Sequence, residues 1–445
     1  MNQQMKNSGV EWIGDIPEKW EMKRLKVLLE ERKEKNDPVK TDFILSLGAS
    51  YGIIPYSEKT GGGNKAKEDF TAYKLAYPKD IVMNSMNIIS GAVGLSEYFG
   101  CVSPVYYVFY PRTDNTCVEY YHMIFQTKEF QRSLLGLGNG ILMKESSSGN
   151  FNTVRMRIPV GKLNTLMLPV PEYDEQVKIA SYLEQKCKDI EELISKTTKS
   201  VEEYKKLKQS VISNAVLKGV SDNVEIKKTE VEWIDSIPKD WKCVKLKNYF
   251  EFGKGLPITK DNLKKEGIPV ISYGQIHAKC NSGTEVTDEL IRYVDDEYKT
   301  SNPTSLVSVG DFIMADTSED LEGCGNATYI DKDMELFAGY HTIILKSSND
   351  NNKYFAYLFL SDQWRSQIRS RVSGIKLFSV TQKILKEVSI LIPPNDEQQR
   401  IVNYLDVKCK EIDKLIASKT LFIEELESMK KTLIYECVTG KREVN

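Results

Sequence analysis

Hydrophobic positions recur with alternating spacings of four and three residues along two segments of the chain, 183–215 and 405–437. This heptad pattern, kept over about six turns or more, predicts two long helices that pack on each other as a coiled coil. A lysine interrupts each pattern at the same late position, Lys208 in the first segment and Lys430 in the second. The residues predicted to pack between the helices are Leu183, Ile190, Ile194, Val201, Leu405, Ile412, Ile416 and Ile423.

Both helices have clear start signals. Each follows a strand-like stretch that ends in proline, "TLMLPVPEY" before the first helix and "VSILIPPN" before the second. Because proline cannot continue a central strand or occupy a helix interior, we expect each helix to begin just after these prolines. Asp174 and Asp396 are the expected N-cap residues, and Glu175 and Glu397 follow in the first turn, where the helix dipole favours carboxylates.

The sequence is internally duplicated. The stretch "VEWIGDIPEKW" at 10–20 returns as "VEWIDSIPKDW" at 231–241. The stretch "DEQVKIASYLEQKCKDIEELI" at 174–194 returns as "DEQQRIVNYLDVKCKEIDKLI" at 396–416. A repeat at a fixed period indicates one structural unit used twice. Between the repeated frames, short hydrophobic strands, glycine turns and one or two helices indicate α+β domains whose interiors differ.

The predicted fold class is therefore α+β, with two domains alternating with two long helices. The helices are expected to pair as an antiparallel coiled coil, and the two halves to form an internal pseudo-twofold repeat. The expected boundaries are 1–172 for the first domain, 173–221 for the central helix, 222–392 for the second domain and 393–445 for the C-terminal helix. Repeated frames around different interiors indicate one mechanical role performed on two different targets.

Composition narrows the class of protein. The chain has 445 residues, 41% of them hydrophobic and 28% charged, which suits a globular protein of several domains. No apolar run approaches the roughly 18 residues of a membrane span, and the N-terminus has no signal-peptide pattern, so we expect a cytoplasmic protein without membrane contact. The eight cysteines form no CxxC pair and there are only three histidines, so we expect reduced, packed thiols and no metal site.

The sequence lacks the motifs of an independent enzyme. There is no GxxxxGK[ST] phosphate-binding loop, and "GLGNG" and "EGCGNA" lack the strand and helix that flank a dinucleotide-binding fingerprint. The stretch "IPPND" is the nearest match to an Asn-Pro-Pro-Tyr motif for positioning adenine, and the start of the helix explains its prolines. We therefore expect no catalytic residue and no bound cofactor on this chain.

The formal net charge is only −2, but cations gather in two places. No acid lies between Gln363 and Lys386, and the matching stretch from Arg132 to Lys162 holds a single acid, Glu145. Beside polar turns, such cations can bind phosphates, while Ser and Asn side chains can read base edges. Solvated helix faces and ordinary turns are the alternative. The candidate DNA contacts here are Lys144, Ser147, Ser148, Asn150, Asn152, Arg155, Arg157, Arg365, Arg369, Arg371, Lys376 and Ser379.

Three further stretches, "GGGNKAK", "NSMN" and "YGQIHAK", combine flexible or polar residues with cations or amides. Glycine allows close approach to a DNA backbone, and Asn or Gln can pair bidentately with adenine. Turn formation by Asn and a purely structural role for the histidine are the alternatives. The candidates in these stretches are Lys65, Lys67, Asn84, Asn87, Tyr273, Gln275, His277 and Lys279.

The repeated phrase "VEWIGDIPEKW", the helix entries "LPVPEYDEQVKIASYLEQK" and "IPPNDEQQRIVNYLDVK", and the order of domains and helices resemble the specificity subunit of Type I restriction-modification systems. The resemblance covers essentially the whole chain. It implies two target-recognition domains that each read one half of a split sequence in double-stranded DNA, held apart by the helices. It also implies two adenine-N6 methyltransferase subunits and two ATP-driven restriction subunits as partners. S-adenosylmethionine, ATP and Mg are expected on those partner subunits only.

Two other readings of the same features stay open. The chain could be the recognition subunit of another bipartite restriction-modification type whose cleavage apparatus differs. It could also be a helical-hairpin assembly protein that carries two ligand-binding domains and binds no nucleic acid. Capture of an adenine methyltransferase would exclude the assembly protein, and co-purifying chains would separate the restriction-modification types.

Overall fold

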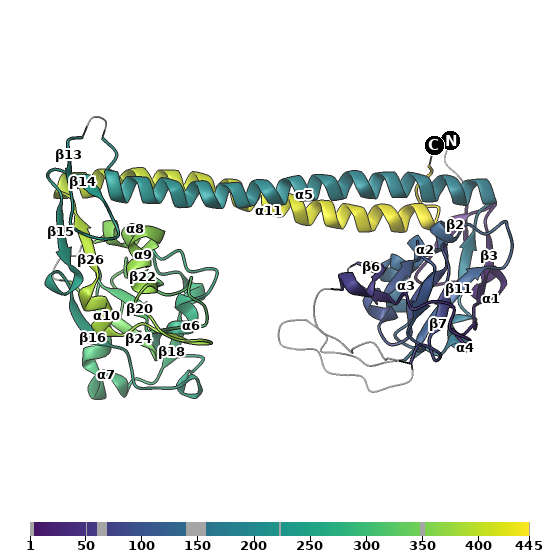
Figure 1. Ribbon diagram of the computed structural model, residues 1–445, viewed down its shortest axis with the longest axis horizontal. Helices are drawn as coiled ribbons and strands as arrows, with labels where there is room; N and C mark the ends of the chain where they lie inside the picture. Colours follow the sequence, from purple (N-terminus) through teal and green to yellow (C-terminus); the bar gives the residue numbers. More distant parts are fainter. Residues whose placement is uncertain are drawn as a thin grey trace. The chain divides into compact units, whose positions relative to one another are not determined.

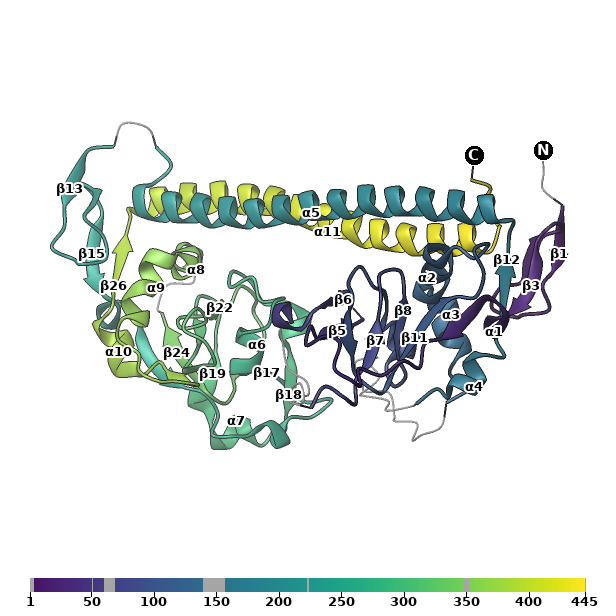
Figure 2. The same ribbon diagram turned by 45° about the vertical axis from the view of Figure 1, so that its right-hand side comes forward.

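The computed structural model describes residues 4–49, 51–59, 69–138, 157–221, 224–347 and 352–444. The chain forms two compact units. Unit 1 combines Met1–Thr197 with Leu421–Asn445, and unit 2 comprises Thr198–Thr420. Each unit contains one mixed domain and one stretch of each long helix (Figure 1 and Figure 2).

The two predicted long helices are present. Helix α5 spans Tyr173–Lys218 and helix α11 spans Asn395–Val438. In unit 1 the first part of α5 lies antiparallel to the last part of α11, and in unit 2 the last part of α5 lies against the first part of α11 (Figure 1). Of the residues predicted to pack between the helices, Leu183, Ile190, Val201, Leu405 and Ile412 are buried, and Ile194, Ile416 and Ile423 are half-buried.

Both long helices begin earlier than the N-cap prediction required. Asp174 and Asp396 lie inside the first turn rather than at the cap, so that part of the prediction was wrong. The helices start earlier because the Glu172 and Pro394 carbonyls already accept the first helical bonds, from the Gln176 N–H at 3.0 Å and the Gln398 N–H at 2.9 Å. A glutamine side chain adds a further bond at each start. The Gln176 side-chain amide donates to the Pro171 carbonyl at 2.9 Å, and Gln398 donates to Pro393 at the same distance.

The domain of unit 1 is built around an antiparallel sheet in the order β4-β11-β8-β9. Helix α2 supplies the buried residues Tyr120 and Phe125 to the same hydrophobic core as this sheet. Strand β3 pairs with β12, the last strand before α5. The strands are β1 Met5–Asn7, β2 Asp15–Pro17, β3 Glu21–Arg24, β4 Leu29–Glu31, β5 Leu45–Gly48, β6 Gly52–Pro55, β7 Lys74–Ala76, β8 Ile81–Asn84, β9 Val93–Leu95, β10 Gly100–Val102, β11 Tyr106–Pro111 and β12 Met167–Val170. The short helices are α1 Leu25–Leu28, α2 Val118–Gln126, α3 Lys128–Ser133 and α4 Val160–Leu163.

The domain of unit 2 has the corresponding antiparallel sheet β16-β24-β20-β22 and a second, mixed sheet β18-β17-β23-β19. Strand β15 pairs with β26, the last strand before α11. The strands are β13 Ile226–Lys228, β14 Ser236–Pro238, β15 Lys242–Lys245, β16 Glu251–Lys254, β17 Ile268–Ile271, β18 Arg292–Val294, β19 Leu306–Val307, β20 Phe312–Ala315, β21 Thr317–Ser318, β22 Ala327–Tyr329, β23 Leu336–Ala338, β24 Thr342–Lys346, β25 Phe378–Ser379 and β26 Ser389–Ile392. The short helices are α6 Tyr273–Ile276, α7 Tyr298–Ser301, α8 Lys353–Leu360, α9 Asp362–Arg369 and α10 Gln382–Glu387.

Each domain is joined to the long helices in the same way. In unit 1 the Tyr120 hydroxyl donates to the Val438 carbonyl near the end of α11 at 2.8 Å. In unit 2 the Tyr354 hydroxyl donates to the Val216 carbonyl near the end of α5 at 2.9 Å. A carbonyl in the last turn of a helix has no partner within the helix, so each tyrosine satisfies a group that would otherwise be buried and unpaired. The duplicated sequence therefore folds into a duplicated junction.

Candidate nucleic-acid interface

A polar pocket lies at the end of strand β20 in unit 2. Three segments that are distant in sequence meet there, because Asp316 donates its backbone N–H to the His341 carbonyl at 3.1 Å and Val380 donates to the Asp316 carbonyl at 2.7 Å. The resulting cavity has a volume of about 530 Å³, and we call it the strand-end pocket. It is lined by Lys254, Gly255, Asp316, His341, Thr342, Ile343, Ser379, Val380, Thr381, Gln382 and Lys383.

The strand-end pocket offers cations together with one carboxylate. Lys254 and Lys383 are exposed and form no ion pair with any residue that the structure describes. The His341 Nδ1 atom lies 3.3 Å from Asp316 Oδ1. Ser379, one of the residues predicted to contact DNA, is exposed at the same pocket. This mixture of phosphate-binding cations and base-reading polar groups suits a nucleic acid.

The same arrangement recurs in unit 1 with different side chains. Asn84 pairs with Tyr106 at the end of β8, as Ala315 pairs with Thr342 at the end of β20. Ile158 then donates to the Ser85 carbonyl at 2.9 Å, as Val380 does to Asp316.

Three predicted DNA contacts of unit 1 lie near one another at this strand end. Asn84 ends strand β8, Asn87 follows three residues later, and Arg157 directly precedes Ile158. Arg157 and Asn87 are exposed. The Asn84 side chain accepts from the Met86 N–H at 3.0 Å, which is the turn-forming role given above as its alternative.

The arginines after α8 are engaged within the protein. Arg365 donates from Nε to the Phe359 carbonyl at 2.6 Å, and burial lowers the pKa of its guanidinium to about 10. Arg369 pairs with Asp362 at 3.2 Å and donates to a backbone carbonyl, and Arg371 donates to the Gln367 carbonyl at 2.6 Å. Contacts from these three arginines to DNA remain predictions, whereas Lys376 is exposed on the loop that follows them.

The stretch 273–279 contacts residues at and beside the strand-end pocket. Gln275 accepts from the Ser272 N–H at 3.2 Å and completes the N-terminal cap of α6. His277 donates from Nε2 to the Thr317 carbonyl at 2.9 Å and accepts at Nδ1 from an asparagine amide at 3.1 Å, which is the structural role given as its alternative. Tyr273 packs edge-on against the imidazole of His341, and Lys279 is exposed.

The remaining candidates lie outside the residues that the structure describes. They are Lys65, Lys67, Lys144, Ser147, Ser148, Asn150, Asn152 and Arg155.

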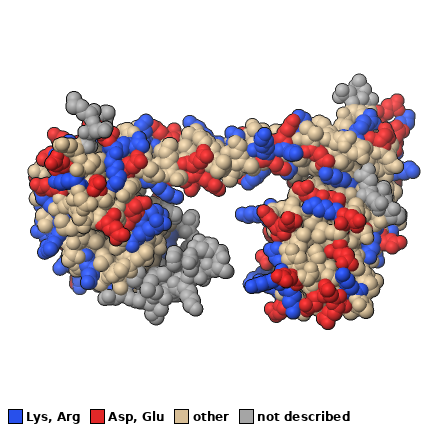
Figure 3. Space-filling view, turned by 180° about the vertical axis from the view of Figure 1, so that it is seen from behind, with Lys and Arg blue, Asp and Glu red and all other residues tan. Residues whose placement is uncertain are grey.

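Charge is mixed on the surface of both units. On the side shown in Figure 3, blue and red side chains are interspersed over each unit. Attraction to phosphate is therefore expected to come from local clusters such as Lys254 with Lys383 rather than from one broad basic face on that side.

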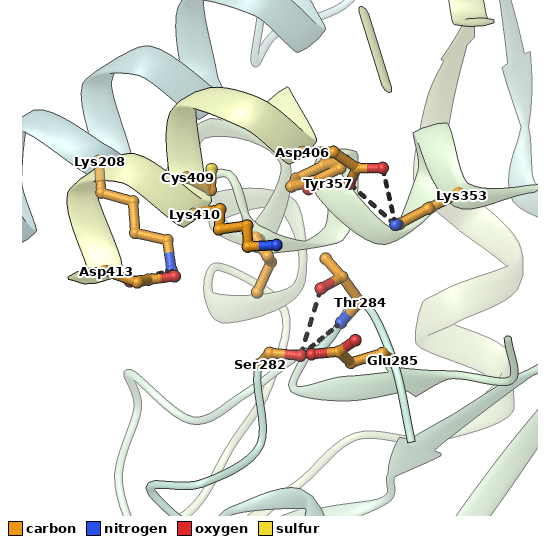
Figure 4. Close-up of a pocket in the computed structure, with 11 residues that line it drawn as sticks. Lys208, Ser282, Thr284, Glu285, Lys353, Tyr357, Asp406, Cys409, Lys410 and Asp413 are labelled. Atoms are coloured by element: carbon orange, nitrogen blue, oxygen red, sulfur yellow. Dashed lines mark hydrogen bonds and ion pairs between the residues drawn. The ribbon is translucent and has the colours of Figure 1, made fainter. Parts of the chain in front are cut away.

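A second pocket in unit 2, of about 390 Å³, lies where the long helices meet the domain (Figure 4). Two ion pairs lie in its lining, one of them between Lys208 and Asp413. Lys353 pairs with Asp406 at 2.8 Å, and the Tyr357 hydroxyl donates to the same carboxylate at 2.6 Å. Burial together with this carboxylate raises the pKa of Tyr357. These paired groups fasten the domain to α11. Lys410 and Glu285 also line the pocket, and both are exposed.

The described residues contain no group of three or more His, Cys, Asp or Glu side chains that could hold a metal ion. Within the same part of the chain, no helix is long and apolar enough to cross a membrane. The eight cysteines are all free thiols, and burial raises the pKa of Cys409 to about 11, which keeps that thiol protonated at neutral pH.

Comparison with known proteins relates the second domain to a known family. Residues 238–425, which include the strand-end pocket, match the family of the Type I restriction modification DNA specificity domain. The specificity subunit named MjaX of a type I restriction enzyme from Methanocaldococcus jannaschii is 24% identical over 450 residues, covering 96% of this chain and 95% of that protein. The MjaVIII specificity subunit of the same organism is 24% identical over 62% of each chain.

Over almost its whole length the chain is similar to the specificity subunits of Type I restriction-modification systems. Solved structures share its fold at 14% sequence identity. One is a chain from a structural study of complex assembly in a type I system, with a TM-score of 0.69 and coverage of 96% of this chain and 99% of that one. Another is the HsdS subunit from Thermoanaerobacter tengcongensis, with a TM-score of 0.53 and coverage of 96% and 98%. The similarity to these subunits supports DNA recognition in a system of this type as the role of the chain.

Sequence reasoning missed Asp316, His341 and Lys254, which lie in three stretches with no common motif. The available signal was that "DFIMAD" and "HTIIL" both predict strands, with Asp316 at the end of one and His341 just before the other. Antiparallel pairing of those strands places these two residues side by side.

Proposed function

We propose that this specificity subunit reads a bipartite sequence in double-stranded DNA, each domain reading one half, and that it carries no catalytic site of its own. The observation that carries the proposal is the recurrence of one strand-end arrangement with different side chains. Asn84, Ser85 and Arg157 occupy it in unit 1, where Ala315, Asp316 and Ser379 stand in unit 2. Two domains that share one strand arrangement but present different polar side chains can recognise two different half-sites.

The partners that we propose are two adenine-N6 methyltransferase subunits and two ATP-dependent restriction subunits, which would bind S-adenosylmethionine, ATP and Mg. Large apolar side chains exposed on the long helices support a protein partner there. Leu193 and Leu207 on α5 are 42% and 48% exposed, and Val407, Leu421 and Met429 on α11 are 52–56% exposed. A cytoplasmic location remains a prediction.

We further propose that the two long helices set the distance between the half-sites. Two readers that enter the major groove from one side need half-sites about one helical turn of DNA apart. A helix of 46 residues at about 1.5 Å per residue is long enough to act as such a spacer.

The test is to express the chain with its methyltransferase partner in a host lacking other adenine methylation and to sequence the methylome. The proposal expects one motif with two defined parts, a spacer without sequence preference and N6-methyladenine in each part. Affinity capture from the same cells should recover the methyltransferase. A methylated motif without two separated parts would contradict the proposal, and capture of a protein complex that binds no DNA would favour the helical-hairpin assembly protein instead.

A further inference from the structure

We propose that Asp316 reads one base of the second half-site, and that His341 is its positioning residue. The base would be one that presents an exocyclic amino group in the major groove, either adenine or cytosine. This inference rests on the proposed function, because it assigns a role within DNA reading by unit 2.

The backbone at His341 is the first observation. Its φ is 55°, in the left-handed region that a non-glycine residue seldom adopts, and Lys79 is the other described non-glycine residue with a positive φ. Neighbours hold His341 in this conformation: its carbonyl accepts from the Asp316 N–H at 3.1 Å, and the Tyr273 ring packs against its imidazole with 5.4 Å between ring centroids. A strained backbone fixed by its surroundings is characteristic of residues that contact ligands.

The carboxylate that this backbone positions is available to a ligand. Asp316 Oδ1 faces His341 Nδ1 at 3.3 Å and accepts from the Thr317 hydroxyl at 2.7 Å. Oδ2 makes no hydrogen bond with any residue that the structure describes. The Asp316 side chain is 35% exposed and the His341 side chain is 59% exposed, and both residues line the strand-end pocket. An acceptor is therefore oriented at the pocket and retains free hydrogen-bonding capacity.

Charge distinguishes base reading from phosphate binding. A carboxylate repels phosphates, so Asp316 opposes non-specific attraction to DNA in a pocket where Lys254 and Lys383 favour it. The favourable partner for a carboxylate in the major groove is an amino group, N4 of cytosine or N6 of adenine. The two lysines can hold the flanking phosphates while Asp316 faces the base.

The fold does not require the Asp316 and His341 pair. At the equivalent place in unit 1, Ser85 stands where Asp316 does and Val105 stands where His341 does, and the Ser85 hydroxyl donates to the Val105 carbonyl at 2.8 Å. The same strand ends therefore form with neutral side chains. The charged pair is specific to the second domain, as expected of a residue that sets what this domain reads.

The experiment compares Asp316→Ser, Asp316→Asn and His341→Asn in the complex with the methyltransferase. Asparagine tolerates the left-handed region, so His341→Asn removes the imidazole without adding backbone strain. Lys79→Asn is the matched control, since Lys79 has a φ of 69° and an exposed ion pair with Glu119 at 3.0 Å. Melting temperatures verify that each variant is folded, and the readouts are methylome sequencing and competition binding with every single-base change in the half-site.

We expect Asp316→Ser to relax the requirement for adenine or cytosine at one position of one half-site. Discrimination at that position should fall by about 5- to 150-fold, and every other position should be unchanged. His341→Asn should relax the same position to a smaller extent, and Lys79→Asn should change nothing.

Folded variants that keep the full sequence requirement, or that lose affinity equally for all sequences, would overturn the assignment. If the wild-type complex itself methylates no bipartite motif, the proposed function fails instead. The identity of the relaxed base decides between adenine and cytosine.

Discussion

Lys208 on α5 and Asp413 on α11 form an ion pair in unit 2, with 2.6 Å between Nζ and Oδ2. Lys430 and Glu191 form the equivalent pair in unit 1. The lysines are 222 residues apart in the chain (430 − 208), and so are the acids (413 − 191). The two lysines that interrupt the hydrophobic seams therefore have one role, which is to bind an acid on the opposite helix and fix the antiparallel register.

This register leads to a prediction about the spacer. Four residues inserted after both Thr197 and Lys419 lengthen each helix by about 6 Å and keep the two ion pairs matched. The methylome should then show both half-sites unchanged, with a spacer longer by one or two base pairs at about 3.4 Å each. The same insertion after Thr197 alone breaks the match between the helices and should impair assembly with the methyltransferase. An active doubly extended complex with the original spacer would show that other elements set the distance.

A second prediction concerns two adjacent buried tyrosines on α2. Tyr120→Phe leaves the Val438 carbonyl without its hydrogen bond, so unit 1 should lose about 1–3 kcal/mol of unfolding free energy. Tyr121→Phe is the matched control, because the Tyr121 hydroxyl is buried and has no hydrogen-bond partner among the described residues. That variant should be neutral or slightly stabilised. Urea unfolding followed by tryptophan fluorescence measures the unfolding free energy of both variants. Equal losses in the two variants would contradict the assigned role of Tyr120.

A third prediction concerns the pH dependence of unit 1. Burial lowers the pKa of His122 to about 4 in the folded state, below its ordinary value of 6.5. The unfolded chain therefore binds the proton more readily, so stability is complete above pH 6.5 and is lost as the pH falls toward 4. The loss should reach at most about 3 kcal/mol. His122→Gln should remove this part of the pH dependence of the melting temperature, and identical curves for the variant and the wild type would exclude the histidine as its source.

A fourth prediction tests phosphate contacts at the strand-end pocket. Lys254→Gln combined with Lys383→Gln should weaken binding to all DNA sequences and reduce the salt dependence of the binding constant. Each lost phosphate contact lowers the slope of log K against log salt by about 0.9. Lys239→Gln is the control, since Lys239 is an exposed lysine of the same unit that pairs with Glu225 at 2.8 Å. An unchanged slope in the double variant would place the two lysines away from DNA.

The sequence predicted the elements whose signals are local or periodic. Heptad spacing predicted both long helices, and the repeated frames predicted one structural unit used twice. The candidates for base reading were harder to predict from the sequence. The strand-end pocket forms only when strand pairing brings Asp316 beside His341. A local charge count also cannot show whether an arginine is free. Arg365 sits in the most basic stretch of the second domain, yet its Nε binds the Phe359 carbonyl.

Exchange of one domain tests whether each domain reads its own half-site. Residues 20–165 are replaced by the matching segment of another specificity subunit whose target is known, and the methylome of the resulting complex is sequenced. We expect a new motif in which one half comes from the donor, while the other half and the spacer length remain those of the original protein. A motif in which both halves change, or in which neither does, would contradict it.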